Sequence, residues 1–511
     1  MTRDLLIPPK EVFQDFGSQE LKLNFIFNLF KIFILLIIFN CSSFSQTDDQ
    51  HQESSIRNLK SSIQKITSDP FFEQTVIALD IFDLTDSISL FKQNEKLLLK
   101  PASNMKLITS IAGLMKLNAS YQFKTDLYHT GIIEGRTLYG DLYVVGGFDP
   151  DFTTDDLDSL VRIIQSLGIK EIKGGVFGDV SMKDSLYWGK GWMWDDDPGS
   201  SEPYLSALNI NRNCIKVFVE GSEIGSPAKV TLIPETDFVG VENNSVTVAS
   251  NTSENFRITR DWVNRSNTIL IDGEVRKSAY IDSSANTKEV NLLNPEKYFM
   301  TLFKEHLEKQ GIIVDKEIGL QKVKDNSVYL TSIERDIDTV LSDLNKESDN
   351  LNAEMLIYAI ALKDSGAPAH AYNGLTAIKE LIDSLNLNPE DYFIADGSGL
   401  SHYNLISAEL LLNALKYVYY QRKDLINLFY NSLAIAGVDG KLKKRMKSSV
   451  ATGNVHAKTG TLKGVSNLSG YVTAKNGHLI AFSIMIQNFV DKYSYARSLQ
   501  DEICKLLAEY K

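Results

Sequence analysis

"KPASNMKLIT" spans residues 100–109 and places Ser103 three positions before Lys106, ahead of an apolar run. Apolar residues follow at helical spacing, so we predict a helix with Ser103 at its N-terminal end. On a helix this spacing brings both side chains to one face, where a lysine can serve as the base for a serine nucleophile. The spacing alone is weak evidence, because Ser62–Lys65 and Ser226–Lys229 share it.

Two further motifs give this pair a chemical context. Residues 348–350 read Ser-Asp-Asn before a second amphipathic helix, and residues 458–461 read Lys-Thr-Gly-Thr at the start of a strand. Lys106 can act as a base only when it is neutral, and burial beside a second cation such as Lys458 would lower its pKa. Ser348 could then relay a proton between that base and a leaving amine.

The same motifs supply groups that can hold a substrate. Asn350 offers an amide to a substrate backbone, and Gly460 would let a peptide approach the edge of its strand closely. The backbone N–H groups of Ser103 and Thr461 are candidates for an oxyanion hole, helped by the positive end of the helix dipole. A substrate carboxylate would be bound by Lys458, Thr459 and Thr461.

Each motif also has an ordinary structural interpretation. Ser103 could be only a helix cap with a solvated Lys106, residues 348–350 only a second cap, and residues 458–460 only the entry to a strand. The occurrence of all three motifs in one chain favours the catalytic interpretation. We therefore predict a serine enzyme that forms a covalent acyl intermediate.

The composition excludes several classes of function. The 511 residues are 43% hydrophobic and 23% charged, and the net charge of −12 leaves no basic stripe for nucleic acid. The seven histidines are scattered without an HExxH motif, so we expect neither a metal nor a cofactor. Outside the N-terminal segment only Cys214 and Cys504 occur, and we expect them to be buried rather than paired.

Residues 1–45 have the character of an export signal. A lysine precedes an apolar stretch over residues 25–39, and small residues flank Phe44, as a signal peptidase requires. We predict cleavage after Ser45, a periplasmic location and no stable membrane anchor after processing. An uncleaved anchor and lipidation of Cys41 are the alternatives.

The pattern of elements predicts an α+β protein whose first domain is interrupted. A strand over residues 75–84 and its hairpin partner precede the Ser103 helix, and short strands separated by Gly, Asp and Asn then dominate. We expect a first domain in two parts, residues 46–120 and 295–511, split by inserted β-rich domains over residues 121–294.

In this order the three motifs resemble those of the penicillin-recognising serine enzymes. The finer likeness, from about residue 75 to the C-terminus, is to the class C low-molecular-mass penicillin-binding proteins. It rests also on "GGFDP" (146–150), "GWMWDD" (191–196) and "DGSGLS" (396–401). The resemblance implies a penicillin-binding (β-lactamase/transpeptidase-like) domain, with an antiparallel sheet flanked by helices and split by the β-rich insertion.

The resemblance also implies an activity. Members of this family are serine-type D-Ala-D-Ala carboxypeptidases that act on peptidoglycan stem peptides through an acyl-enzyme, and some cleave peptide cross-links as DD-endopeptidases. We therefore expect carboxypeptidase activity and covalent binding of β-lactam antibiotics as inhibitors. The resemblance leaves open whether cross-links are cleaved as well. The family further implies that Asp196 helps recognise the diamino-acid side chain of the stem peptide. Where members often carry Arg after "DGSGLS", this chain has His402.

Two other functions share parts of this pattern. A β-lactamase carries the same three motifs but lacks a long insertion, and a catalytically inactive peptidoglycan-binding scaffold would lack some of the chemical groups. Neither fits the chain as well as a carboxypeptidase does. Labelling with a fluorescent penicillin would separate the three, because a scaffold takes no label, a β-lactamase loses it quickly and a carboxypeptidase holds it.

Overall fold

The computed structural model describes residues 53–249, 256–277 and 286–511. The chain divides into a small unit, Met1–Ser62 with Lys511, and a large unit, Ile63–Tyr510, which contains every predicted site residue. In the small unit residues 53–62 are helical. The predicted export signal lies outside the described residues. Among the helices that the structure describes, none is long and apolar enough to cross a membrane.

A six-stranded antiparallel sheet forms the centre of the first domain, in the order β18-β19-β20-β21-β1-β2. Its strands are β1 (Val76–Asp83), β2 (Ile88–Gln93), β18 (Ala434–Ile435), β19 (Val455–Leu462), β20 (Val465–Thr473) and β21 (Leu479–Gln487). The predicted N-terminal hairpin and C-terminal strands are thus confirmed, and they meet where β1 pairs with β21.

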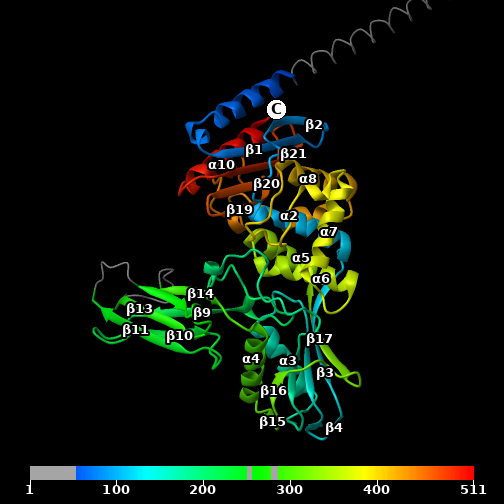
Figure 1. The fold of residues 1–511 in the computed structure, drawn as a ribbon, viewed down its shortest axis with the longest axis vertical. Coiled ribbons are helices and arrows are strands. Elements are labelled where there is room, and N and C mark those ends of the chain that lie inside the picture. The colour runs from blue at the N-terminus through cyan, green and yellow to red at the C-terminus, as the bar shows by residue number, and fades with distance from the viewer. Residues whose placement is uncertain (1–52, 250–255, 278–285) are drawn as a thin grey trace, which may run out of the picture. The chain divides into compact units, whose positions relative to one another are not determined.

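Helices cover both faces of this sheet (Figure 1). Along β21, Ala481 and Met485 pack into a core with the helices α2 (Met105–Leu117), α6 (Asn350–Ser365) and α8 (Ala408–Gln421). Side chains alternate between the faces of a strand, so Phe482 and Ile484 face the other side. On that side α10 (Tyr493–Glu509) packs against β20 and β21. Because both faces are covered, β21 is apolar along nearly its whole length.

Helix α2 is buried on all sides, although its sequence predicts a single apolar face. Every residue from Met105 to Leu114 is buried, including Lys106. The helix runs through the helical layer and contacts α6, α8 and α7 (Ala371–Ser384). Two short helices, α5 (Ile337–Ser342) and α9 (Ile426–Ser432), complete this layer. The lysine therefore lies in the core of the domain rather than on a solvated helix face.

The inserted region contains four small sheets. Their orders are β16-β8-β6-β3-β17, β15-β7-β5-β4, β10-β9-β14 and β11-β13-β12. The strands before residue 200 are β3 (Gln122–His129), β4 (Ile132–Glu134), β5 (Thr137–Tyr139), β6 (Leu142–Gly147), β7 (Glu171–Ile172) and β8 (Val176–Asp179). Those that follow are β9 (Cys214–Glu220), β10 (Lys229–Ile233), β11 (Val241–Val248), β12 (Arg257–Arg260), β13 (Ile269–Arg276) and β14 (Thr287–Asn291). A helix that the sequence did not predict, α3 (Thr154–Ser166), begins with a capping box at Thr153.

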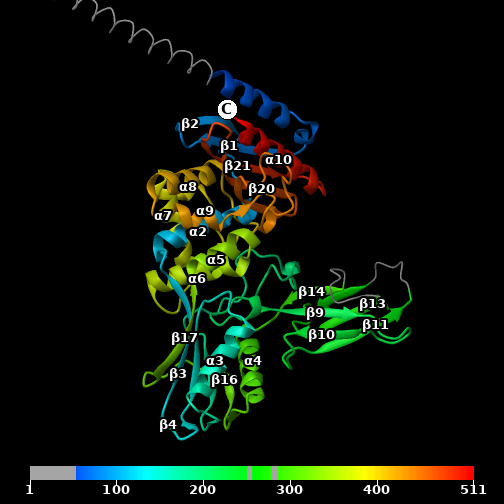
Figure 2. The same cartoon turned by 180° about the vertical axis from the view of Figure 1, so that it is seen from behind.

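The strands after residue 294 pair with the inserted region. After α4 (Pro295–Lys309), β15 (Ile313–Val314), β16 (Ile318–Leu320) and β17 (Val328–Asp336) pair with β7, β8 and β3. Strands β3 and β17 lie side by side in both views (Figure 1 and Figure 2). We therefore propose that the insertion extends to about Asp336, beyond the boundary at residue 294 that the change in pattern predicts. The sequence could not reveal this, because the pairing joins segments about 200 residues apart.

The two cysteines behave as small apolar residues. Cys214 and Cys504 are both free and buried, as expected. Burial raises the pKa of both thiols, so they stay protonated and unreactive.

Candidate active site

Ser103 and Lys106 meet at the junction of a short 3-10 turn and helix α2. The turn η2 (Ala102–Asn104) holds Ser103, and Lys106 follows in the first turn of α2. The Nζ atom of Lys106 donates a hydrogen bond to Ser103 Oγ over 3.1 Å. Burial of the lysine side chain lowers its pKa to about 8, so the neutral form is accessible near physiological pH.

Two further acceptors hold the amine of Lys106. Its Nζ atom donates to the side-chain oxygen of Asn350 and, over 2.6 Å, to the carbonyl oxygen of Ser398. Neither oxygen can donate a hydrogen bond in return. The protonated amine can donate to all three oxygens, as the contacts show. A neutral amine has two N–H groups, and if Asn350 and Ser398 accept from both, its lone pair is left for the hydroxyl of Ser103, as a general base requires.

Ser348 and Lys458 form a second pair beside the first. Ser348 sits in the left-handed region, with φ of 65°, between the π-helical turn η5 (Asp343–Glu347) and α6. The Nζ atom of Lys458 donates to Ser348 Oγ over 2.7 Å. Burial, with a further contribution from the positive charge of Lys106, holds the pKa of Lys458 well below its usual value. The charge of Lys106 therefore acts on Lys458, whereas the lowered pKa of Lys106 itself comes from burial and not from Lys458, on which the sequence-based prediction also relied.

Asn350 links Lys106 to the inserted region. Its Oδ1 atom accepts from Lys106, and its Nδ2 atom donates to the carbonyl oxygen of Ser201 over 2.6 Å. Ser201 lies between β8 and β9 in the inserted region. Both ends of the amide are therefore occupied in this structure, and a substrate backbone would have to replace the bond to Ser201.

Strand β19 carries the third motif along a partly open edge. Strand β18 pairs only with His456 and Ala457 of β19. From Lys458 to Thr461 the same edge has no strand neighbour among the described residues. Backbone groups there can pair with an extended peptide that adds as a strand.

Gly460 has a structural role that the sequence did not indicate. A Cβ atom built on this glycine would lie 2.8 Å from the carbonyl oxygen of Pro101 and 3.1 Å from the backbone nitrogen of Asn104. In addition, Asn104 Nδ2 donates to the carbonyl oxygen of Lys458 over 2.6 Å. The glycine therefore lets β19 pack directly against the turn that bears Ser103.

A buried carboxylate that the sequence analysis missed shapes the loop around Ser398. Glu354 Oε1 accepts hydrogen bonds from the backbone N–H groups of Gly397, over 3.1 Å, and Ser398, over 2.8 Å. Burial raises the pKa of Glu354 to about 8. An acid four residues after Asn350, within the otherwise apolar helix α6, was a signal that could have revealed it.

A second buried carboxylate, Asp396, fixes the rest of the loop. Its Oδ1 atom accepts from the backbone N–H of Gly399 over 2.8 Å, and its Oδ2 atom from that of Ser401 over 2.7 Å. The indole N–H of Trp192 donates to Asp396 over 2.9 Å. The predicted segments 191–196 and 396–401 are therefore in direct contact.

Asp196 and His402 lie near each other, half-buried, at the ends of these two segments. The Nδ1 atom of His402 is 3.3 Å from Nζ of Lys100, a residue that the sequence analysis did not single out. Burial and the charge of Lys100 lower the pKa of His402, whereas burial raises the pKa of Asp196. The pair thus offers one acidic and one mostly neutral polar group beside a lysine.

The sheet, the Ser103–Lys106 pair and the Ser348–Lys458 pair beside it together define a penicillin-recognising serine enzyme. The chain belongs to the D-Ala-D-Ala carboxypeptidase 3 (S13) family, whose model matches residues 59–510. The predicted class, a serine-type D-Ala-D-Ala carboxypeptidase, is thereby confirmed.

Similar proteins agree with this family. A D-alanyl-D-alanine carboxypeptidase of Actinomadura sp. (strain R39) is 30% identical over 89% of this chain and 85% of its own length. The D-alanyl-D-alanine carboxypeptidase DacB of Haemophilus influenzae is 29% identical over 76% of this chain and 80% of its own. A crystal structure of penicillin binding protein 4 (dacB) from the same organism aligns with a TM-score of 0.74, 25% identity and coverage of 87% and 99%.

Proposed function

We propose that Ser103 is the nucleophile that attacks the carbonyl between the two terminal D-alanines of a peptidoglycan stem peptide. The observation that carries this assignment is the arrangement around Lys106, whose two pure acceptors direct its lone pair to Ser103 Oγ. As the Oγ–C bond forms, the hydroxyl proton passes to Lys106 Nζ. The backbone N–H groups of Ser103 and Thr461 stabilise the negative oxygen.

The proton then has to reach the leaving amine. Ser348, which accepts a hydrogen bond from Lys458, can donate its own hydroxyl proton to the amine nitrogen and recover one from Lys106. The C–N bond breaks, D-alanine leaves and an ester remains on Ser103. Water then attacks this ester, with Lys106 again as base, and restores the free serine.

The motif around β19 would hold the C-terminal end of the substrate. The terminal carboxylate binds to Lys458, Thr459 and Thr461, and its negative charge favours the protonated form of Lys458. The peptide backbone lies along the open edge of β19 and forms a hydrogen bond with the side-chain amide of Asn350. Asp196 and His402 contact the side chain of the diamino acid. In a cross-linked substrate, a carboxylate of the second stem peptide can bind to the same three residues. We therefore include DD-endopeptidase activity, the cleavage of such cross-links, in the proposal.

We further propose that β-lactams acylate Ser103 and that the protein works in the periplasm. A β-lactam carbonyl presents the same electrophile and a nearby carboxylate. Export is supported by the apolar stretch at residues 25–39 and by the small residues around Phe44. The substrate itself lies outside the cytoplasmic membrane.

The test is digestion of purified muropeptides by the mature protein, combined with fluorescent penicillin labelling. We expect loss of the terminal D-alanine from pentapeptides, cleavage of cross-linked dimers and a label that persists for minutes or longer. Rapid loss of the label with hydrolysed penicillin in solution would instead identify a β-lactamase. Absence of both label and cleavage would identify a binding scaffold.

A further inference from the structure

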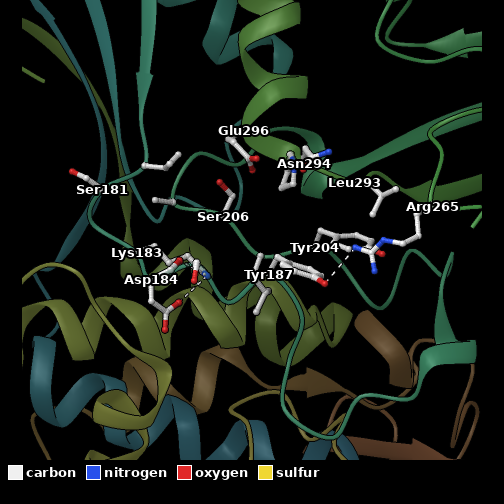
Figure 3. Close-up of a pocket in the computed structure, with 15 residues that line it drawn as sticks. Ser181, Lys183, Asp184, Tyr187, Tyr204, Ser206, Arg265, Leu293, Asn294 and Glu296 are labelled. Atoms are coloured by element: carbon white, nitrogen blue, oxygen red, sulfur yellow. Dashed lines mark hydrogen bonds and ion pairs between the residues drawn. The ribbon is translucent and has the colours of Figure 1, made fainter. Parts of the chain in front are cut away.

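A second cavity of about 460 Å³ lies in the inserted region (Figure 3). Its walls come from residues 180–187 and 204–207, from the loop between β12 and β13, and from the start of α4. None of its lining residues belongs to the catalytic site described above. Its volume lies within the range that is usual for small-molecule binding sites.

The lining mixes apolar and polar side chains, and its charges are balanced. Lys183 and Arg265 carry positive charge, and Asp184 and Glu296 carry negative charge. Serine hydroxyls line the same space, at residues 181, 185 and 206. A lining with equal numbers of opposite charges does not select an ion. It offers hydrogen-bond donors and acceptors to a neutral ligand that is rich in hydroxyl or amide groups.

Stacked rings form the side of the cavity nearest the β12–β13 loop. Tyr187 stacks on Tyr204 with centroids 5.9 Å apart and planes 17° apart. Arg265 lies over the Tyr187 ring and donates to its hydroxyl over 3.3 Å. Tyr187 remains 48% exposed. Rigid aromatic edges beside hydrogen-bonding groups suit ligands with apolar C–H faces and polar rims, which is the chemistry of a sugar ring.

Of the four charged groups, Lys183 and Asp184 bind each other, Arg265 uses one donor on Tyr187, and Glu296 keeps its carboxylate available to a ligand. Lys183 donates to Asp184 over 3.2 Å, and Asp184 also contacts His370 over 3.1 Å. By contrast, the half-buried carboxylate of Glu296 has no hydrogen bond or ion pair to any residue that the structure describes. Arg265 has no carboxylate within ion-pair distance in the same part of the chain. Figure 3 shows Glu296 at the top of the cavity and Arg265 to its right.

One short segment links this cavity to the catalytic site. The carbonyl oxygen of Ser201 accepts from Asn350, and three residues later Tyr204 enters the cavity wall. We propose that the cavity binds the glycan part of peptidoglycan, a neutral saccharide of N-acetylated hexosamines, while the stem peptide occupies the catalytic site. This inference rests on the proposed function, because it assigns a second contact to the same substrate.

The experiment compares two substrates and one sugar. The ratio of kcat/KM for a disaccharide-pentapeptide to that for the sugar-free pentapeptide is measured with the full mature chain. Binding of the peptide-free disaccharide N,N′-diacetylchitobiose is measured by calorimetry. We expect a ratio of about ten, because one added hydrogen-bonded contact to a charged group has about that effect. We also expect chitobiose to bind.

Variants then locate the contact. Glu296→Ala and Arg265→Ala should each bring the ratio close to one and weaken chitobiose binding by about tenfold. Glu308→Ala, at the exposed far end of the same helix α4, is the matched control and should leave both values at the wild-type level.

Three negative outcomes are distinguishable. A protein that cleaves neither substrate refutes the proposed function itself. The second outcome is cleavage of the free pentapeptide with a kcat/KM ratio near one and no binding of chitobiose. That result overturns the glycan site but leaves the proposed function intact. A ratio above one that both cavity variants leave unchanged also overturns it, because the sugar would then bind elsewhere.

Discussion

The Nζ atom of Lys106 lies 2.6 Å from the carbonyl oxygen of Ser398, a residue 292 positions later in the chain. This contact orients the amine that serves Ser103. Its geometry depends on the loop after α7, which two buried carboxylates hold in place. The base that we propose, Lys106, is thus positioned by residues outside the three motifs.

The pH dependence of acylation should report the base. Lys106 must be neutral to accept the proton, and its pKa is lowered to about 8. Below that pH the amine is protonated, so the acylation rate constant should rise with pH and level off above about 8. The measurement is the second-order rate constant for a penicillin between about pH 6 and about pH 10. A rate that is flat across this range would exclude Lys106 as the base.

Glu354 should act as a positioning residue. Glu354→Ala leaves two buried N–H groups without acceptors, so we expect stability to fall by about 1–3 kcal/mol and kcat/KM to fall at least about tenfold. Glu354→Gln keeps an acceptor oxygen and should restore most of both. Since the charge of Glu354 raises the pKa of Lys106, the Gln variant should also shift the rising pH limb downwards. If the wild type and Glu354→Gln have equal pH profiles, and Glu354→Gln restores neither stability nor kcat/KM, then the role of Glu354 is merely structural.

Gly460→Ala should disturb the turn that bears Ser103. The added Cβ atom would contact Pro101 and Asn104 too closely, and we expect a loss of about 1–3 kcal/mol in the free energy of unfolding. Acylation should slow in parallel, because the strain falls next to the nucleophile. Gly319→Ala is the control, since a Cβ atom there meets nothing within 4 Å. Wild-type acylation in Gly460→Ala would show that the close packing is unimportant.

His402 should weaken the preference for a free carboxylate on the diamino acid. Its lowered pKa keeps it mostly neutral at pH 7, whereas Arg would hold a fixed charge. His402→Arg should therefore increase the preference for free-acid over amidated stem peptides by roughly 1 kcal/mol. In the wild type, KM for the free acid should fall only as pH drops below the usual range of histidine, because protonation supplies the positive charge. Identical acid-to-amide ratios in the two proteins would show that His402 does not touch this group.

The sequence predicts correctly those site residues whose positions depend only on a single helix or strand. Ser103 and Lys106 are one helical turn apart, and Lys458 lies in the strand that its own segment predicts, so short-range patterns sufficed. The partners of these residues were harder to foresee. Glu354 and Asp396 act on a loop that only the packing of α6 beside α2 brings to Lys106. The reason for Gly460, contact with Pro101 and Asn104, likewise depends on a neighbour about 350 residues away.

The domain boundary shows the same limit. Residues 295–336 read as helices and strands that could continue either domain, and only the pairing of β17 with β3 supports our proposal that they belong to the insertion. Pairing between distant strands leaves no local signature in the sequence.

The attachment point of the acyl group tests the assignment most directly. The mature protein is incubated with penicillin, digested and analysed by peptide mass spectrometry, beside Ser103→Ala treated in the same way. We predict one adduct, with the mass of the intact penicillin, on the peptide that contains Ser103. We predict no adduct on Ser103→Ala, whose circular dichroism should match that of the wild type. An adduct on another serine, or stoichiometric labelling of the folded Ser103→Ala protein, would contradict the account.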